Sequence, residues 1–213
     1  MNLRISKKRF IYLISPNIIY PKFYQDLKEI LETGKVGIFQ MRFKKYSFKQ
    51  KMLIGKKISQ ICKANKVTFL VNDDPKLSKK LNADGCHLGQ NDMSIDKAKK
   101  IIGNKIIGIT CHNSIKLAKI AIKNKASYIA FGAFFKSKTK KTKYKASTKI
   151  LKKTKLLTKN PIVAIGGINN KNYLKLINNG ANLIAISGFV WRNKNPKTAS
   201  KSFTKTNNST SND

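Results

Sequence analysis

Short runs of aliphatic and β-branched residues alternate along the chain with longer segments in which apolar residues recur every three or four positions. The short runs have the length and composition of buried strands, and the longer segments have the period of amphipathic helices. The eight expected strands are 10–14, 36–41, 67–72, 85–88, 106–110, 128–132, 162–166 and 183–187. The expected helices between them are 23–32, 47–65, 75–81, 94–102, 114–124, 148–158 and 170–179.

This regular order of strand and helix predicts an α/β protein with a parallel sheet. Eight such units in so short a chain match a single (β/α)8 TIM barrel with parallel strands, which we place at residues 1–192. From residue 193 the chain becomes rich in Lys, Ser, Thr and Asn. We expect residues 193–213 to be a polar C-terminal tail, with at most a short helix before a disordered end, because little apolar surface remains to offset the entropy of ordering.

Local signals support the limits of several helices. Asp74 and Pro75 have the order of an N-cap followed by proline at the first helical position. Ser94 and Ser114 are placed to cap the helices that follow them, and Gly180 is placed to end a helix.

The length and the residue totals favour a soluble enzyme of one domain. The chain has 213 residues, and no part of it approaches the roughly 18 consecutive apolar residues that span a bilayer. We therefore expect a cytoplasmic protein that does not associate with membranes. Cys62, Cys86 and Cys111 show no metal-binding spacing, and we expect buried, reduced thiols.

The net charge of +36 raises the question of nucleic acid. Only four of the 45 basic residues are arginine, the residue that most groove-reading proteins use, and the lysines are spread along the chain together with many Asn and Ile residues. That composition is typical of an A+T-rich coding sequence, so we expect no nucleic-acid partner. A basic nucleic-acid-binding protein stays the alternative from another class, and it predicts binding that collapses with salt.

Polar residues gather where the expected strands end, which in a parallel barrel is the rim that carries the active site. Gln40, Arg42 and Lys44 lie at alternate positions and so on one face, and the two cations suit a diphosphate. Asp73 and Asp92, two of only nine acidic residues, follow neighbouring strands. Two carboxylates with phosphate oxygens and water are the usual ligands of Mg²⁺, although either acid could instead cap a helix.

Glycines follow the seventh and eighth expected strands. Gly166-Gly167 and Ser187-Gly188 lie where barrels of this kind bind a phosphate group through backbone N–H groups, although a Gly-Gly pair is also typical of a tight turn. The rim is thus suited to two phosphorylated ligands, a diphosphate with Mg²⁺ on one side and a monophosphate on the other.

The strand ends together resemble the thiamine-phosphate synthase family. The resemblance rests on Gln-Met-Arg-Phe-Lys, Val-Asn-Asp-Asp, Ala-Asp-Gly-Cys-His-Leu-Gly-Gln-Asn-Asp-Met, Lys-Ser-Lys-Thr-Lys, Ala-Ile-Gly-Gly-Ile and Ile-Ser-Gly, in order over residues 10–192. It implies coupling of 4-amino-2-methyl-5-hydroxymethylpyrimidine diphosphate with 4-methyl-5-hydroxyethylthiazole phosphate to give thiamine monophosphate and pyrophosphate. Cleavage of the pyrimidine C–O bond would come first, followed by attack of the thiazole nitrogen.

The resemblance also implies a role for each matching residue. The pyrimidine diphosphate would contact Gln40, Arg42, Lys44, Asn72, Thr110 and Lys140. The thiazole phosphate would contact Ser137, Thr139, Gly167, Ile186 and Ser187. Asp73 and Asp92 would carry Mg²⁺, while Arg42, Lys44 and Lys140 would neutralise the leaving pyrophosphate and so act in catalysis.

The chain departs from the family pattern at three points. Lys136-Ser137 replaces the common Pro-Thr, six lysines fall within residues 136–145, and Thr110 replaces a serine. A thiazole tautomerase of the same superfamily is the closest rival, because it shares a motif ending in the position of His112 and uses that histidine for proton transfer. It generally lacks the Asn-Asp and Thr-Lys pairs found here. His87 is expected to make a structural hydrogen bond, and the oligomeric state stays open, a homo-oligomer included.

Overall fold

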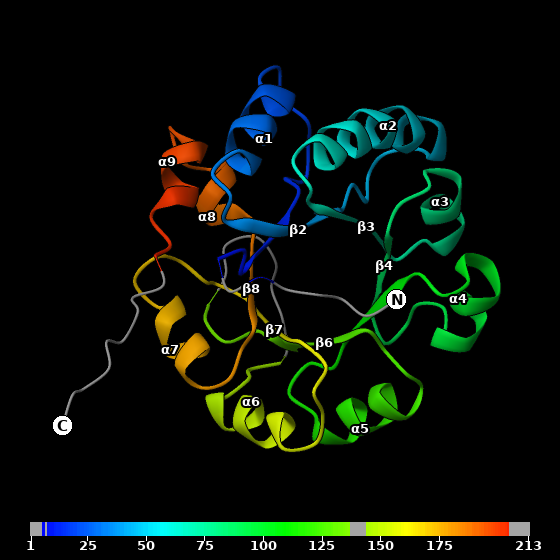
Figure 1. The fold of residues 1–213 in the computed structure, drawn as a ribbon, viewed down its shortest axis with the longest axis vertical. Helices are drawn as coiled ribbons and strands as arrows, with labels where there is room; N and C mark the ends of the chain where they lie inside the picture. The colour runs from blue at the N-terminus through cyan, green and yellow to red at the C-terminus, as the bar shows by residue number, and fades with distance from the viewer. Residues whose placement is uncertain (1–5, 7, 137–143, 205–213) are drawn as a thin grey trace.

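The computed structural model describes residues 6, 8–136 and 144–204. Its strands are all parallel and close into a barrel in chain order, with the last strand paired to the first (Figure 1). The strands are β1 Ile11–Ile14, β2 Val36–Met41, β3 Thr68–Asn72, β4 Gly85–Leu88, β5 Ile106–Thr110, β6 Tyr128–Gly132, β7 Ile162–Ile165 and β8 Leu183–Ile186. The (β/α)8 barrel predicted from the hydrophobic pattern is confirmed.

Helices form a ring around the barrel (Figure 1). They are α1 Phe23–Leu31, α2 Phe48–Ala64, α3 Pro75–Lys80, α4 Ile95–Ile102, α5 Ile115–Lys123, α6 Thr148–Lys155, α7 Tyr173–Asn178, α8 Gly188–Trp191 and α9 Pro196–Lys201. Two predicted limits differ by more than one residue: α6 ends at Lys155, and α7 begins at Tyr173 because residues 169–172 form a turn in which the Asn169 N–H donates to Asn172 Oδ1.

The predicted capping residues act as expected. The side chains of Asp74, Ser94 and Ser114 each accept a hydrogen bond from the backbone N–H three residues later. Pro75 occupies the first helical position of α3, and Gly180 follows α7 with a φ of +108°. These local bonds fix where α3, α4 and α5 begin, and thereby the loops that lead from the rim into each helix.

Side chains on the strands alternate between two separate cores. One core lies between the barrel and the helices, and the other fills the barrel interior. The interior core contains Tyr12, Ile14, Ile38, Leu70, Ile106, Tyr128, Ala130, Val163, Leu183 and Ala185. Because every second residue of a strand faces the interior, the same alternation carries Gln40, Asn72, His87 and Thr110 to inward positions near the rim.

The chain after residue 192 forms α9, which contacts α1 and α8. Phe203 is fully buried, with its ring centroid 5.1 Å from that of Tyr173 and 5.4 Å from that of Phe189. One aromatic residue in a polar segment thus holds this part of the chain against the barrel. The domain division at residue 192 stays a prediction, and the expected disordered end lies mostly in residues 205–213, outside the described residues.

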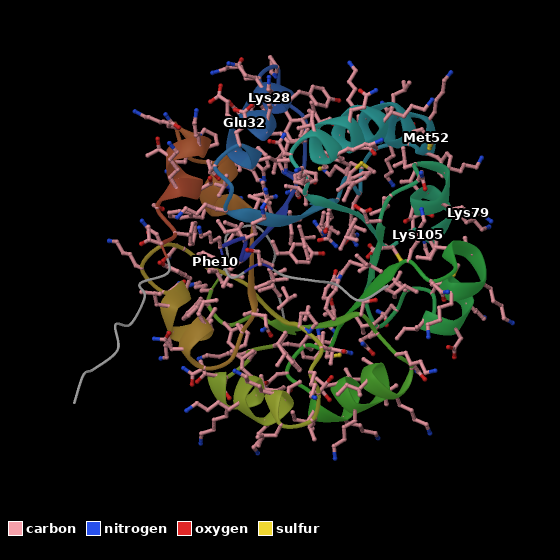
Figure 2. All side chains as sticks on the ribbon, in the orientation of Figure 1. Phe10, Lys28, Glu32, Met52, Lys79 and Lys105 are labelled. Carbon is pink, nitrogen blue, oxygen red and sulfur yellow. The ribbon has the colours of Figure 1, made fainter. Side chains whose placement is uncertain are left out.

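Basic side chains are spread over the outer surface. Figure 2 shows nitrogen-tipped side chains projecting outward all around the ring of helices, Lys28 and Lys79 among them. In the described part of the chain, no helix combines the length and the apolar character needed to cross a membrane. Cys62, Cys86 and Cys111 are buried free thiols, as predicted.

Candidate active site

The ends of β2 and β3 place two amides side by side at the rim. Gln40 is 2% exposed and donates through Nε2 to Asn72 Oδ1 at 3.1 Å. Arg42 follows two residues later, and its backbone N–H donates to Ser15 Oγ at 2.8 Å, which ties the end of β2 to the end of β1. The structure therefore brings Gln40, Arg42 and Asn72 to one side of the barrel opening.

A lysine and two carboxylates form the charged part of this rim. Lys44 Nζ lies 2.9 Å from Asp73 Oδ2. Partial burial raises the pKa of Asp73, but the Lys44 ammonium, Asp92 and His87 together hold that pKa below its usual range. Burial raises the pKa of Asp92, and the Asp73 carboxyl raises it further against the effect of a backbone N–H. The two acids thus lie close enough to act on each other's protonation.

The backbone holds both acids at the rim. Asp73 has a φ of +63°, and its N–H donates to the His87 carbonyl at 2.8 Å. Asp92 Oδ2 accepts from the Gly89 N–H at 2.7 Å. Asp74 caps α3 and Ser94 caps α4, so neither Asp73 nor Asp92 serves as a helix cap. Helix capping, the alternative considered for the two acids, is therefore excluded.

A line of hydrogen bonds runs from the barrel interior to the rim. Tyr12 and Tyr128 hydroxyls lie 2.8 Å apart, the Tyr128 hydroxyl lies 2.8 Å from His87 Nδ1, and His87 Nε2 lies 2.8 Å from Thr110 Oγ1. Burial lowers the pKa of His87 to about 4, with the Asp73 carboxylate opposing and Arg42 reinforcing the shift. His87 therefore makes the structural hydrogen bonds that were expected of it.

The predicted phosphate cradle lies at the ends of the neighbouring strands β7 and β8. Gly167 has a φ of +63°, and a Cβ there would lie 2.4 Å from the Lys136 carbonyl oxygen, so the position requires glycine. Ser187 is the N-cap residue of α8, and its Oγ donates to the Ser15 carbonyl at 3.2 Å. Ile186, directly before it, is buried at the end of β8.

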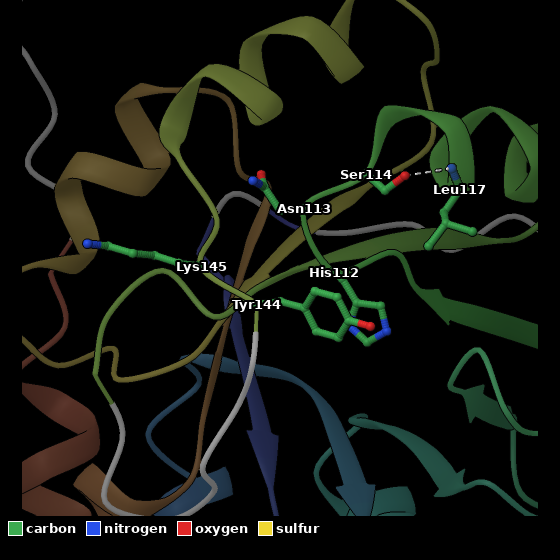
Figure 3. A pocket seen from close by; sticks show the side chains of 6 residues that line it. All are labelled: His112, Asn113, Ser114, Leu117, Tyr144 and Lys145. Carbon is green, nitrogen blue, oxygen red and sulfur yellow. Dashed lines mark hydrogen bonds between the residues drawn. The ribbon is translucent and has the colours of Figure 1, made fainter.

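A cavity of about 370 Å³ opens between the loop that follows β5 and the segment of Tyr144 and Lys145. Figure 3 shows the His112 and Tyr144 rings lying over each other, and their centroids are 4.0 Å apart with an angle of 18° between the planes. Ser114 lines the cavity while its hydroxyl caps α5, and Lys145 points away from the stacked rings (Figure 3). His112 has a φ of +51°, so its backbone is in the left-handed region.

The structure places ten of the thirteen predicted site residues at the rim, and the other three are not among the residues it describes. Those at the rim are Gln40, Arg42, Lys44, Asn72, Asp73, Asp92, Thr110, Gly167, Ile186 and Ser187. Ser137, Thr139 and Lys140 lie outside the described residues. The individual role of each residue stays a prediction.

Sequence reasoning missed residues that support the rim. Ser15 is 3% exposed at the end of β1 and joins the segments of Arg42 and Ser187. Gln90 donates through Nε2 to the Thr110 carbonyl at 2.5 Å. The signal for Ser15 was its place directly after the first expected strand, a strand end that was not searched for polar residues.

A parallel eight-stranded barrel with acids, cations and a glycine turn at its C-terminal rim is typical of an enzyme that acts on phosphorylated compounds. A model of one protein family, thiamine monophosphate synthase, matches residues 11–190. The chain therefore belongs to the thiamine monophosphate synthase family.

Similar proteins agree with this assignment. The thiamine-phosphate synthase of Pelagibacter ubique is 59% identical over 191 residues, which cover 89% of this chain and 92% of the relative. That of Erythrobacter litoralis is 41% identical over 186 residues, covering 85% and 87% of the two chains. The thiamine phosphate pyrophosphorylase structure from Pyrococcus furiosus has a TM-score of 0.82 at 29% identity and covers 92% of this chain and 95% of its own. The predicted thiamine-phosphate synthase function is confirmed over the tautomerase alternative.

Proposed function

We propose that this chain joins 4-amino-2-methyl-5-hydroxymethylpyrimidine diphosphate to 4-methyl-5-hydroxyethylthiazole phosphate in a reaction that depends on Mg²⁺. The observation that carries the proposal is the cluster of Lys44, Asp73 and Asp92 on one side of the rim, with the Gly167 turn on the other. The cluster can hold a metal and a diphosphate, and the turn can hold a second phosphate. The products are thiamine monophosphate and pyrophosphate.

The carboxylate pair fits Mg²⁺ by its chemistry. Within residues 6, 8–136 and 144–204, no group of three or more His, Cys, Asp or Glu side chains could hold a metal ion. Mg²⁺ commonly uses one or two carboxylates and takes its other ligands from phosphate oxygens and water. Asp73 and Asp92 would therefore hold the ion only together with a diphosphate, and the ion would supply neutralisation of the leaving pyrophosphate.

The side chains at the rim would bind the diphosphate and neutralise its charge as the C–O bond breaks. Arg42 and Lys44 would face the diphosphate, so that the electron pair of the breaking C–O bond leaves with pyrophosphate. The thiazole nitrogen then forms the new C–N bond to the same methylene carbon. No proton has to be removed from the nucleophile, so the proposed reaction needs no side-chain base at the rim.

The second substrate would lie against the glycine turn. Gly167, Ile186 and Ser187 would hold the thiazole phosphate, because the ends of β7 and β8 are adjacent. By the family resemblance, Ser137 and Thr139 would complete this subsite and Lys140 would reach the diphosphate. Such an arrangement holds the nucleophile in line with the bond that breaks.

The charge of the surface agrees with a small-molecule enzyme. Basic side chains project from the whole ring of helices rather than from one face (Figure 2), and nucleic-acid readers concentrate them in a patch or stripe. We infer a cytoplasmic enzyme without a nucleic-acid partner. Sequence-selective DNA or RNA binding at 0.2 M salt would contradict this inference.

A coupling assay tests the proposed function. The parent protein is incubated with both phosphorylated precursors, with Mg²⁺ or with EDTA, and pyrophosphate and thiamine monophosphate are measured. We expect both products in equal amounts with Mg²⁺ only, and a rate at least 100-fold lower for Asp92→Ala, because loss of charge stabilisation at the leaving group costs roughly 3 kcal/mol or more. Isomerisation of the thiazole without pyrophosphate release would instead support the tautomerase.

A further inference from the structure

The hydrogen bonds between Tyr12, Tyr128, His87 and Thr110 have a direction that donor counting can establish. Tyr12 is 2% exposed and Tyr128 is fully buried, and both belong to the apolar core inside the barrel. In the described part of the chain, the Tyr12 hydroxyl has one hydrogen-bond partner, the Tyr128 hydroxyl. A buried O–H without an acceptor is costly, so the Tyr12 hydroxyl must donate its proton to Tyr128.

This first step fixes the direction of the others. The Tyr128 oxygen accepts from Tyr12, so its own proton is donated to His87 Nδ1. A neutral imidazole that accepts at Nδ1 carries its proton on Nε2, and that N–H donates to Thr110 Oγ1. The Thr110 hydroxyl thus accepts a hydrogen bond from His87, and its own proton is left to be donated to a group at the rim.

The opposite direction is unfavourable. If Thr110 donated to Nε2, Nδ1 would donate to Tyr128 and Tyr128 to Tyr12, which would leave the Tyr12 proton in an apolar core without an acceptor. A doubly protonated imidazole would also leave the Tyr12 proton without an acceptor, because its Nδ1–H would donate to Tyr128. The apolar core around Tyr12 therefore selects one tautomer of His87.

Gly108 makes this arrangement sterically possible. A Cβ at Gly108 would lie 1.8 Å from Cζ of Tyr128, so the tyrosine ring occupies the space that a side chain would take. The ring is also stacked on the His87 imidazole, with centroids 5.6 Å apart and an angle of 16° between the planes. Packing thus fixes the positions that the hydrogen bonds require.

We propose that His87 is a positioning residue which, held in one tautomer by Tyr128 and Tyr12, presents the Thr110 hydroxyl to the bound pyrimidine diphosphate as a hydrogen-bond donor. The proposal rests on the proposed function, because it takes the pyrimidine diphosphate as the ligand at this side of the rim. The partner of the hydroxyl is an acceptor, a diphosphate oxygen or a ring nitrogen. Thr110 accordingly selects a ligand that offers a lone pair there.

Imidazole ¹⁵N chemical shifts test the tautomer without any assay of activity. The chain has two histidines, so His112→Asn identifies the His87 signals. We expect protonation at Nε2 and none at Nδ1 in the parent protein, and a mixture of tautomers in Tyr128→Phe. A parent protein protonated at Nδ1 would overturn the proposal, whatever its activity.

Kinetics test the consequence for the ligand. Tyr128→Phe removes the donor to Nδ1, and we expect the KM for the pyrimidine diphosphate to rise by roughly 3- to 10-fold, with the KM for the thiazole phosphate unchanged. Tyr173→Phe is the matched control, because its hydroxyl is also bonded in the protein but to Thr204, away from the rim. Equal kinetic effects of the two substitutions would refute the proposal.

A double-mutant cycle separates an effect through Thr110 from a general loosening of the barrel. Thr110→Val removes the donor, and adding Tyr128→Phe to it should raise the KM no further. Inhibition constants of the parent protein and of Thr110→Val are then compared for pyrophosphate with Mg²⁺ and for the pyrimidine alcohol. Weaker inhibition by pyrophosphate identifies a diphosphate oxygen as the acceptor, and weaker inhibition by the alcohol identifies a ring nitrogen. Additive effects would refute the proposal while leaving the function intact, whereas an inactive parent protein would refute the function itself.

Discussion

Replacement of Asp92 by asparagine should stabilise the free protein and strongly reduce its response to Mg²⁺ with pyrophosphate. In the free protein Asp92 faces Asp73, and each acid alters the pKa of the other. An amide removes the repulsion and still offers an oxygen to the Gly89 N–H, which the carboxylate accepts at 2.7 Å. The proposed cation site is thus destabilised by the repulsion between its two carboxylates in the free protein.

The size of the effect follows from the exposure of the pair. Two like charges about 4 Å apart repel by roughly 1 kcal/mol in water and by about 4 kcal/mol near a protein surface. Asp92 is exposed and the Lys44 ammonium lies 2.9 Å from Asp73, so the lower value applies and part of it is already offset. We expect Asp92→Asn to raise the free energy of unfolding by about 0.5 kcal/mol, or Tm by about 1–2 °C.

With ligand bound, the parent protein should instead be more stable than Asp92→Asn. At tenfold its Kd, a ligand stabilises the folded protein by about 1.4 kcal/mol, which corresponds to roughly 3–6 °C in Tm. Thermal unfolding is therefore measured without ligand, with Mg²⁺, with pyrophosphate and with both. We expect the parent protein to gain with both together, and Asp92→Asn to gain much less, because one carboxylate ligand is missing.

Asp96→Asn is the matched control. It removes another of the nine acidic residues, but from the first turn of α4, where a carboxylate favours the helix. We expect it to lower Tm slightly and to keep the response to Mg²⁺ with pyrophosphate. If Asp92→Asn also lowered Tm in the free protein, or kept the full ligand response, the view of Asp73 and Asp92 as a shared cation site would be wrong.

Three further substitutions test other parts of the rim. The folded-state pKa of His87 is about 4 against an ordinary 6.5, so its contribution to stability is complete above pH 6.5 and is lost as the pH falls towards 4, by up to roughly 3 kcal/mol. Urea unfolding from pH 4.5 to 7.5 should show a shallower decline for His87→Gln than for the control His112→Gln. Ser15→Ala leaves the backbone N–H after β2 without its acceptor, and it should cost about 1 kcal/mol and raise the KM for the pyrimidine diphosphate. Its control Ser78→Ala, which loses a bond at the opposite end of the barrel, should leave that KM unchanged. Gly167→Ala meets a carbonyl oxygen at 2.4 Å and should raise the KM for the thiazole phosphate, a result that an unchanged KM would contradict.

The fold could be predicted because each strand carries its own signal. A run such as Ile162–Ile165 is short and aliphatic, and each of the eight strands is a short, largely apolar run with a helical segment after it. The turn at residues 169–172 was not predicted, because it carries no apolar signal. The Asn172 side chain accepts from the Asn169 N–H and the Asn169 side chain accepts from the Lys171 N–H, and these local bonds compete with the first turn of α7. Apolar periodicity does not register such bonds.

The candidate site was predictable as a set of strand ends but not as a set of contacts. Alternation along β2 gives the shared face of Gln40 and Arg42, whereas the pairing of Lys44 with Asp73 depends on a backbone with positive φ at Asp73. Nothing in the neighbouring residues signals that conformation, because glycine is the usual residue for it.

Barrel closure explains why support for the rim comes from residues that sequence motifs leave out. Ser15 directly follows β1, which pairs with both β2 and β8. Its hydroxyl therefore reaches the segment of Arg42, and its backbone carbonyl reaches that of Ser187. These segments are far apart in the sequence and belong to the sides assigned to different substrates. Under the proposed function, a residue beside the closing strand would therefore set the distance between the two ligands, and for attack of the thiazole nitrogen on the methylene carbon that distance matters as much as either binding site alone.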